Sequence, residues 1–315
     1  MKKLRLLSLF SGIGAFEEAL KNIGVDYELI NYCEFQKFIS KAYSLIHSVD
    51  ENLNLGDISK VDETKLKDFD LMTYGFPCQD ISALGTQQGL FDEDGNLTRS
   101  GLFFEAMRIA NFKKPKYMIA ENVKALTSKK MKSNFDEMLK MLNDIGYNSY
   151  YKILNSKDYG IPQSRNRVFI VSIRKDIDDG DFIFPNKQEL KIKASDLYDD
   201  CDISDEFYLQ EKHYKYFNEF RLKKKYSSLN SDILVCMTTK QGQKSNPQNF
   251  IKDSKGYRTL TDRELFAFQG FKKEYGDLLK NNGFTTSQIG YMTGNSITVP
   301  VLEAIFKNLF LNSYL

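Results

Sequence analysis

The stretch "LRLLSLFSGIGAFEEALKNIG", residues 4–24, decides the fold that we expect of this chain. Its apolar run at 4–10 predicts a β-strand, "SGIGA" predicts a glycine turn, and the following segment predicts a helix that ends at Gly24. A strand that enters a helix through a glycine turn begins a βαβ unit, and repeated units of this kind build a parallel sheet.

The same alternation continues to residue 175. Strands are predicted at 27–34, 69–76, 116–123, 150–156 and 167–175, and helices at 35–47, 98–115, 134–146 and 299–311. This order predicts an α/β fold, a mostly parallel, Rossmann-like sheet with helices on both faces.

Composition narrows the class of protein. The chain has 315 residues and a net charge of +2, so charge alone does not indicate a nucleic-acid partner. Four cysteines without a CxxC pair, and two histidines, indicate neither a zinc site nor a disulfide framework. No apolar stretch reaches 18 residues, and the N-terminus lacks the cleavage pattern of a signal peptide. We therefore expect a cytoplasmic protein without a membrane segment.

The weak net charge hides a local division. Residues 179–206 carry nine acidic side chains against three lysines, whereas residues 207–257 carry ten basic side chains against four acidic ones. We expect a catalytic and cofactor-binding domain at 1–176, completed by 287–315, and a second, loop-rich domain at 177–286. The basic part of this second domain predicts a surface for an anion, or alternatively a solvated face with a flexible loop.

The glycine turn is a candidate cofactor site. Gly12 and Gly14 give a GxG pattern before a helix, where a close backbone and unpaired N–H groups bind nucleotides. Glu17 stands where a third glycine would complete the dinucleotide pattern, so we expect a cofactor that lacks phosphate. The alternative is a turn that only makes a tight corner.

The end of the second predicted strand supports this interpretation. Glu34 could accept both ribose hydroxyls, Phe35 could stack on an adenine, and Asp57 could accept an exocyclic amine. Together they predict a site for an adenosine. A solvated helix cap is the alternative for Glu34.

A thiol and three charged groups are predicted at the same edge of the sheet. Cys78 of "GFPCQDIS" follows the carboxyl end of a strand, where open α/β sheets bind ligands. Glu121 ends the next strand, and Arg165 and Arg167 alternate at a later strand start. They suit a thiol nucleophile with acid and base partners, or alternatively a structural ion pair beside an inert cysteine.

These motifs, in order, resemble those of the cytosine-5 DNA methyltransferases of bacterial restriction–modification systems. The resemblance covers residues 4–175 and 256–312 and rests on "FSGIGAFE", "GDI", "GFPCQDIS", "TRSGLFFEAMRI", "ENV", "QSRNRVFIV", "RTLTDRELFAFQGF" and "GNSITVPVLEAI". Phe35 stands where the family usually has tryptophan, and Ala15 where a second glycine is common. The resemblance implies a methyltransferase large domain and a target-recognition domain at 177–286.

It also implies an enzyme and its reaction. The enzyme would transfer a methyl group from S-adenosylmethionine to C5 of a cytosine flipped out of a specific short duplex DNA sequence, without a metal. Cys78 would add to C6, and Glu121 would hold and protonate N3. Arg165 would contact the base O2, with Arg167 as its support.

The resemblance further implies binding residues and partners. Cofactor contacts are expected from Phe10, Gly12, Ile13, Gly14, Glu34, Phe35, Asp57, Ile58, Pro77, Leu102, Asn295 and Ser296. DNA contacts are expected from Gln79, Ser82, Lys223, Lys224, Lys225, Thr238, Thr239, Lys240, Gln241, Gln243 and Lys244. We expect a monomer that acts on double-stranded DNA in a bacterium or phage, and a restriction endonuclease for the same site is a candidate partner.

Three other functions compete with this interpretation. An RNA-methylating branch of the family carries a Cys-Phe-Thr tripeptide, which this sequence lacks. An inactive accessory subunit would not need the intact thiol, carboxyl and guanidinium set. A Rossmann oxidoreductase would place a glycine at position 17.

Overall fold

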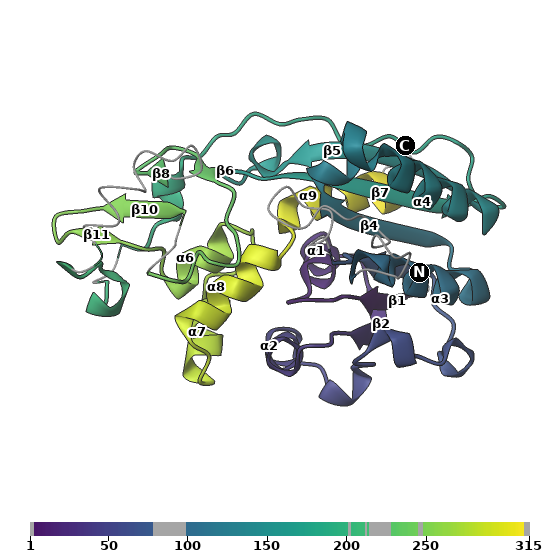
Figure 1. Cartoon of the computed structure of the whole chain (residues 1–315), viewed down its shortest axis with the longest axis horizontal. Coiled ribbons are helices and arrows are strands. Elements are labelled where there is room, and N and C mark those ends of the chain that lie inside the picture. The colour runs from purple at the N-terminus through teal and green to yellow at the C-terminus, as the bar shows by residue number, and fades with distance from the viewer. Residues whose placement is uncertain are drawn as a thin grey trace.

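A computed structural model describes residues 3–77, 99–200, 203–211, 213, 228–244 and 248–311. Within these residues, six strands form a central sheet in the order β2-β1-β3-β4-β7-β5 (Figure 1). The strands are β1 (Leu4–Leu9), β2 (Tyr27–Cys33), β3 (Leu71–Tyr74), β4 (Tyr117–Val123), β5 (Tyr147–Asn155) and β7 (Asn166–Arg174). This architecture confirms the predicted α/β class.

Strand β7 runs against the other strands described in this sheet. It pairs antiparallel with both β4 and β5, whereas β1 to β4 pair in parallel. The connection from β5 to β7, residues 156–165, is too short for a helical crossover, so the chain must turn back beside itself. As a result, the start of β7 lies at the carboxyl edge of β4, where Arg167 pairs with Val123.

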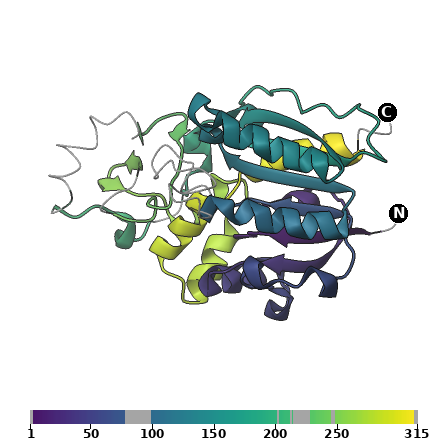
Figure 2. The same ribbon diagram turned by 45° about the vertical axis from the view of Figure 1, so that its right-hand side comes forward.

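Helices cover both faces of the sheet. Helices α1 (Ala15–Asn22), α2 (Lys37–His47) and α9 (Val299–Phe306) share one apolar cluster, and α3 (Phe103–Lys113) and α4 (Lys132–Asp144) share the other. Figure 2 shows α3 and α4 lying over the strands on one side. Neighbouring residues of β1 divide between the clusters, Leu6 to the first and Leu7 to the second, as the strand period of two requires. Burying each such leucine contributes about 1.5–3 kcal/mol.

A second region lies beside the sheet, on the left of Figure 1. In the described part of the chain, β8 (Ser228–Leu229), β10 (Asn249–Lys252) and β11 (Tyr257–Arg258) form one small sheet, and β6 (Gln163–Ser164) pairs with β9 (Leu234–Val235). Helices α6 (Asp262–Ala267), α7 (Glu274–Asn281) and α8 (Thr286–Asn295) lie between β10 and β11 on one side and the central sheet on the other (Figure 1).

The two regions share much of their core. Phe266 of α6 and Ile289 of α8 belong to the same apolar cluster as α1 and α9. The small sheet adds a cluster around Leu209 and Phe250, among the described residues. The domain limits at 177 and 286 stay predictions. Of the helices that the structure describes, none combines the length and apolar character that crossing a membrane requires.

Candidate active site

The topology brings the predicted site residues to one edge of the central sheet. Parallel strands β1 to β4 end there, and antiparallel β7 begins there. This edge therefore carries the glycine turn after β1, Glu34 after β2 and the segment 75–77 after β3. It also carries Glu121 near the end of β4 and Arg167 near the start of β7. Cys78, Gln79 and Ser82 lie outside the described residues, which end here at Pro77.

Glu121 and Arg167 form an ion pair at this edge. Arg167 Nε lies 2.9 Å from Glu121 Oε1, and their side chains are 17% and 12% exposed. Burial raises the pKa of Glu121, although the charges of Arg167 and Arg165 oppose the shift. A carboxyl whose pKa is raised by burial holds its proton more tightly, which suits a group that donates a proton to a substrate.

The backbone that leads into Cys78 is held against this pair. A Cβ atom added to Gly75 would lie 3.8 Å from Glu121 Oε2, so the end of β3 lies beside the carboxylate. Asn122 is buried, and its Nδ2 donates to the Phe76 carbonyl at 3.1 Å. The "ENV" motif thus supplies an acid and also an amide that fixes the chain two residues before the thiol. Sequence reasoning missed this second role.

The Arg165 side chain is buried and forms its hydrogen bonds within the protein. It is 2% exposed, and its guanidinium donates to the carbonyls of Met237 (2.9 Å), Gly294 (3.0 Å) and Ser296 (2.7 Å). A fourth contact joins Nη1 to Cys236 Sγ at 3.3 Å. Burial alone would raise the pKa of this thiol, but the nearby guanidinium groups outweigh it and lower the pKa.

The geometry differs from what was expected for the two arginines, whose roles in the reaction stay predictions. Arg165, expected to contact the base, uses its Nη donors on backbone carbonyls, whereas Arg167 is the arginine paired with Glu121. Their alternation on one strand face does not apply, because Arg165 lies between β6 and β7 rather than within β7.

The glycine turn adopts backbone conformations that most residues avoid. Phe10 and Gly14 both adopt the left-handed region, with φ of 53° and 76°. The His47 ring lies under the turn, where Nε2 makes a 3.0 Å hydrogen bond with the Ile13 carbonyl. A Cβ atom on Gly14 would overlap this ring, so the position requires glycine for space and for conformation. His47 was not predicted to be part of this site.

Glu34 ties the end of β2 to the glycine turn. Its carboxylate accepts from Gly12 N at 3.1 Å and from Gln36 N at 2.8 Å. Burial raises its pKa against these two hydrogen bonds. The next side chain, Phe35, is 74% exposed, which is unusual for a large aromatic ring. An acceptor beside an uncovered ring fits the ribose and adenine of an adenosine-bearing cofactor.

The other predicted cofactor residues differ in how they could contribute. Asp57 Oδ1 accepts from Ser59 N (3.1 Å) and Ser59 Oγ (2.8 Å), and these bonds lower the pKa of its partly exposed carboxyl. The side chains of Ile13 and Ile58 are buried, so these residues would offer backbone atoms. Pro77 and Leu102 are half-buried, Ser296 is buried and Asn295 is exposed.

Glu17 does not face the glycine turn. It is fully buried in α1, and Tyr43 of α2 donates to its Oε1 at 2.8 Å. The expectation of a cofactor without phosphate therefore does not follow from this charge, because the Glu17 carboxyl is buried against Tyr43.

The predicted DNA residues separate into three groups. Lys223, Lys224 and Lys225 lie outside the described residues. Lys240 and Gln243 are exposed, whereas Thr238, Thr239 and Lys244 are half-buried. Gln241 is fully buried, and its amide bonds the backbone and side chain of Asn249, so its expected base contact stays a prediction that this position does not support.

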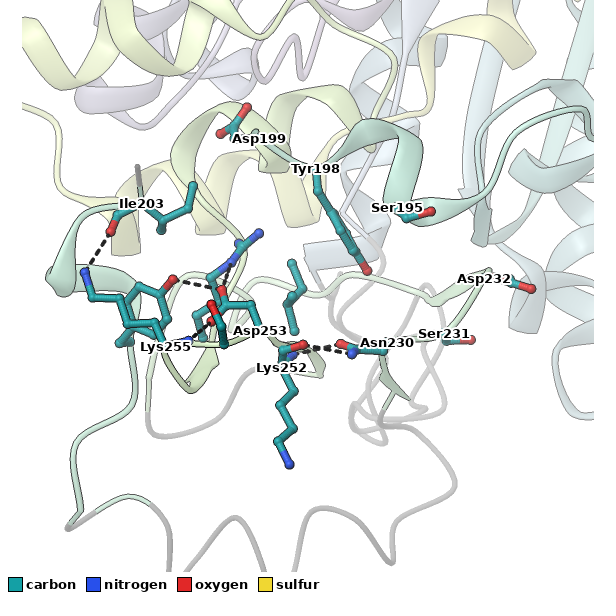
Figure 3. A pocket seen from close by; sticks show the side chains of 14 residues that line it. Ser195, Tyr198, Asp199, Ile203, Asn230, Ser231, Asp232, Lys252, Asp253 and Lys255 are labelled. Atoms are coloured by element: carbon teal, nitrogen blue, oxygen red, sulfur yellow. Dashed lines mark hydrogen bonds and ion pairs between the residues drawn. The ribbon is translucent and has the colours of Figure 1, made fainter. Parts of the chain in front are cut away.

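A cavity of about 520 Å³ lies in the second region. On one side of it, Asn230 and Lys252 exchange hydrogen bonds of 2.9 and 2.8 Å (Figure 3). Its wall mixes acidic side chains, such as Asp199 and Asp253, with basic ones, such as Lys255. The mixture does not define one kind of ligand.

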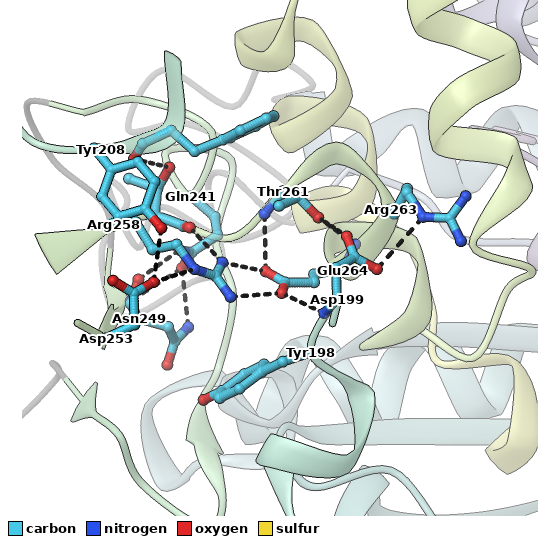
Figure 4. A network of polar contacts seen from close by, with 12 residues as sticks. Tyr198, Asp199, Tyr208, Gln241, Asn249, Asp253, Arg258, Thr261, Arg263 and Glu264 are labelled. Carbon is cyan, nitrogen blue, oxygen red and sulfur yellow. Dashed lines mark hydrogen bonds and ion pairs between the residues drawn. The ribbon is translucent and has the colours of Figure 1, made fainter. Parts of the chain in front are cut away.

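A buried ion pair beside this cavity holds the second region to α6 (Figure 4). Arg258 donates to both oxygens of Glu264 at 2.8 and 2.9 Å, and both side chains are almost fully buried. Glu264 also caps α6 by accepting from Thr261 N, and Thr261 Oγ1 donates to Asp199 at 2.6 Å. The network attaches Asp199 and strand β11 to α6, the helix from which the chain returns toward the central sheet.

Comparison with known proteins shows which family this chain resembles. The profile of the family described as C-5 cytosine-specific DNA methylase matches residues 4–311. The chain is 41% identical over 276 residues to the type II methyltransferase M2.ScrFI of Lactococcus lactis subsp. cremoris, covering 82% of this chain and 71% of that protein. It is 30% identical over 322 residues to the type II methyltransferase M.Bsp6I of Bacillus sp. (strain RFL6), covering 98% of each.

Other relatives are longer or more distant. The chain spans 35% and 39% of two orphan methyltransferases from Bacillus phages rho11s and SPR. The structure of Entamoeba histolytica methyltransferase EhMeth shares the fold, with a TM-score of 0.81 at 17% identity over 99% of each chain. The family profile spans nearly all of the sequence, and M.Bsp6I matches it end to end. The chain therefore belongs to the C-5 cytosine-specific DNA methylase family.

Proposed function

We propose that this protein methylates C5 of a cytosine flipped out of a specific short sequence in duplex DNA, with Cys78 as the nucleophile. The observation that carries the proposal is the Glu121–Arg167 pair, set beside the backbone that leads into Cys78. A target atom inside a duplex is inaccessible, so the base must leave the stack to reach this edge of the sheet.

The residues divide the reaction between them. The Cys78 thiolate forms a bond to C6 while Glu121 gives a proton to N3, and the ring becomes an enamine that is nucleophilic at C5. S-adenosylmethionine supplies, when bound, the electrophilic methyl group that C5 takes. N3 then returns its proton to Glu121, water takes the C5 proton, and the electron pair of the C5–H bond expels the thiolate from C6 and restores the aromatic ring. Cysteine suits both steps because its thiolate attacks well and leaves well.

Arg167 and Arg165 act in different ways. Arg167 holds Glu121 in place and is the arginine that faces the flipped base. Arg165 is a positioning residue, since it joins the segment at Met237 to the end of α8 through buried hydrogen bonds.

The cofactor would lie against the glycine turn. Glu34 would accept the ribose hydroxyls, Phe35 would stack on the adenine, and Asp57 would accept the exocyclic amine. Phe35 keeps the aromatic face that tryptophan usually supplies, so stacking survives the replacement.

The second region would bind the duplex. Lys240 and Lys244, together with Lys223–Lys225, would contact phosphates, which position DNA without reading its sequence. Gln243 can make paired hydrogen bonds to an adenine. Because the relatives include type II methyltransferases, we propose a role in restriction–modification, with an endonuclease that cuts the same site.

The experiment combines purified protein, S-adenosylmethionine and unmethylated plasmid DNA, followed by bisulfite sequencing, with Cys78→Ser as control. We expect cytosines protected in one short recurring sequence, and no protection by the variant. A folded protein that binds the cofactor but protects no cytosine in DNA would contradict the proposal. Methylation of transfer RNA in a parallel reaction would then identify an RNA enzyme.

A further inference from the structure

Segment 238–242 lies on α8 with backbone directly against backbone. A Cβ atom on Gly242 would overlap the Thr286 carbonyl, and one on Gly290 would overlap the backbone of Gly242. A Cβ atom on Gly294 would overlap the carbonyl group of Thr238. These three glycines, 242, 290 and 294, form what we name the glycine seam.

Space, rather than backbone conformation, requires glycine at these positions. None of the three adopts the left-handed region, so alanine would not strain the backbone itself. Gly290 lies inside α8, where glycine is normally less stable than alanine. Gly290 and Gly294 are four residues apart, so they line one face of the helix. The seam therefore explains a residue that helix propensity disfavours.

The seam decides which side chains of the segment face outward. Gln241 and Gly242 are buried, whereas Lys240 and Gln243 are exposed. Backbone bonds of 3.0 Å from Gln241 to Thr238 and from Gln243 to Lys240 turn the chain, and the Gln241 amide fastens it to Asn249. The turn thus leaves the side chains of Lys240 and Gln243 exposed, and this exposed part of the turn is its outer side.

Buried groups connect the same segment to the reaction site. Gln163 accepts from Met237 N at 3.0 Å and donates to the Phe268 carbonyl at 2.7 Å. Arg165 bonds the carbonyls of Met237 and Gly294 from the chain just before β7, whose second residue is Arg167. The outer side of the turn is therefore held at a fixed place relative to the Glu121–Arg167 pair.

We propose that the glycine seam is a positioning device that sets target specificity, and that Lys240 and Gln243 are the side chains it presents to DNA. This inference rests on the proposed function, because it assigns part of the target recognition for the same reaction. Lys240 neutralises a phosphate, and Gln243 contacts a base edge.

Gly290→Ala tests the seam, with Ser287→Ala as the matched control on an exposed position of the same helix. The measurements are the methylated sequence profile on a randomised duplex library, KM for cognate DNA, and cofactor affinity by calorimetry. For Gly290→Ala we expect KM to rise about tenfold and the preference for the cognate sequence over its near neighbours to fall about tenfold, since a displaced base contact loses that much. Cofactor affinity and the Ser287→Ala variant should match wild type.

Two outcomes would overturn the inference. The first is a Gly290→Ala protein with the wild-type profile and KM, above all if its Tm rises as for an ordinary glycine-to-alanine change in a helix. The second is an unchanged methylated sequence profile for Gln243→Ala, which would refute the contact between Gln243 and a base. This variant changes a surface residue, so it leaves the seam intact and avoids a folding failure. A wild-type protein that methylates no DNA would instead refute the proposed function.

Discussion

Arg165→Met and Arg167→Met should separate two roles that the sequence does not distinguish. Arg165→Met removes three hydrogen bonds that a buried guanidinium donates to backbone carbonyls. These bonds connect the chain after β6 to the segment at Met237 and to the end of α8. Carbonyls left buried without a donor cost about 1–3 kcal/mol each, and relief of the buried charge offsets part of this cost. We expect a loss of about 3–5 kcal/mol, comparable to breaking other buried ionic contacts.

The two variants have nearly equal volume and hydrophobicity, so each controls for the other. For a chain of 315 residues, a loss of that size corresponds to roughly 1.5 °C of Tm for each kcal/mol, or about 5–8 °C in all. Arg167→Met should lower Tm much less, because Glu121 can accept a proton once its partner is gone, yet methyl transfer should fall by at least about 10².

The assay is circular dichroism at one fixed scan rate, combined with single-turnover methyl transfer. The two guanidinium groups would have the opposite roles if Arg165→Met had the wild-type Tm while Arg167→Met lost about 5–8 °C, and that result would refute the assignment.

Three further predictions follow from single side chains. Phe35→Ala should weaken cofactor binding about tenfold and Phe35→Trp should restore it; equal affinity of all three proteins in calorimetry would contradict stacking. His47→Ala should also weaken cofactor binding by loosening the turn at Ile13, with little change in KM for DNA, whereas an equal rise in both would point to a general loss of structure. Asp262, which accepts from Thr286 in the buried start of α6, has a pKa raised to about 6 by burial. Its folded state binds more protons than the unfolded state between pH 4 and 6, so stability should fall as pH rises through this window, by up to about 2–3 kcal/mol. Asp262→Asn should remove that slope in denaturant titrations from pH 4 to 8, and an unchanged slope would show that another group causes it.

The sequence predicted the strand-and-helix frame because its signals are local. Alternating apolar segments and the turn at Gly12 and Gly14 were enough to place the strands at one edge. The reversal of β7 was not predicted, since it depends on the space between β5 and β7 rather than on the pattern within either strand.

At the candidate site, the orientation of polar side chains could not be predicted from the sequence. Arg165, Glu17 and Gln241 are polar residues that tertiary contacts bury, and a residue type gives no indication of the partner that will satisfy it. His47 and Gly290 were missed for a related reason, because each matters only through a segment distant in sequence that lies against it.

The central claim is the bond between Cys78 and C6 of the target base. The most direct measurement uses a duplex that carries the methylated sequence with 5-fluorocytosine at the target position, incubated with protein and S-adenosylmethionine. Because the fluorine cannot leave C5 as a proton would, the thiol should stay attached, and intact mass should equal protein plus DNA plus one methyl group. Peptide mapping should place the adduct on Cys78, and Cys78→Ser should form none. Methylation of the normal duplex without any adduct on the fluorinated one, or an adduct on another residue, would contradict the account.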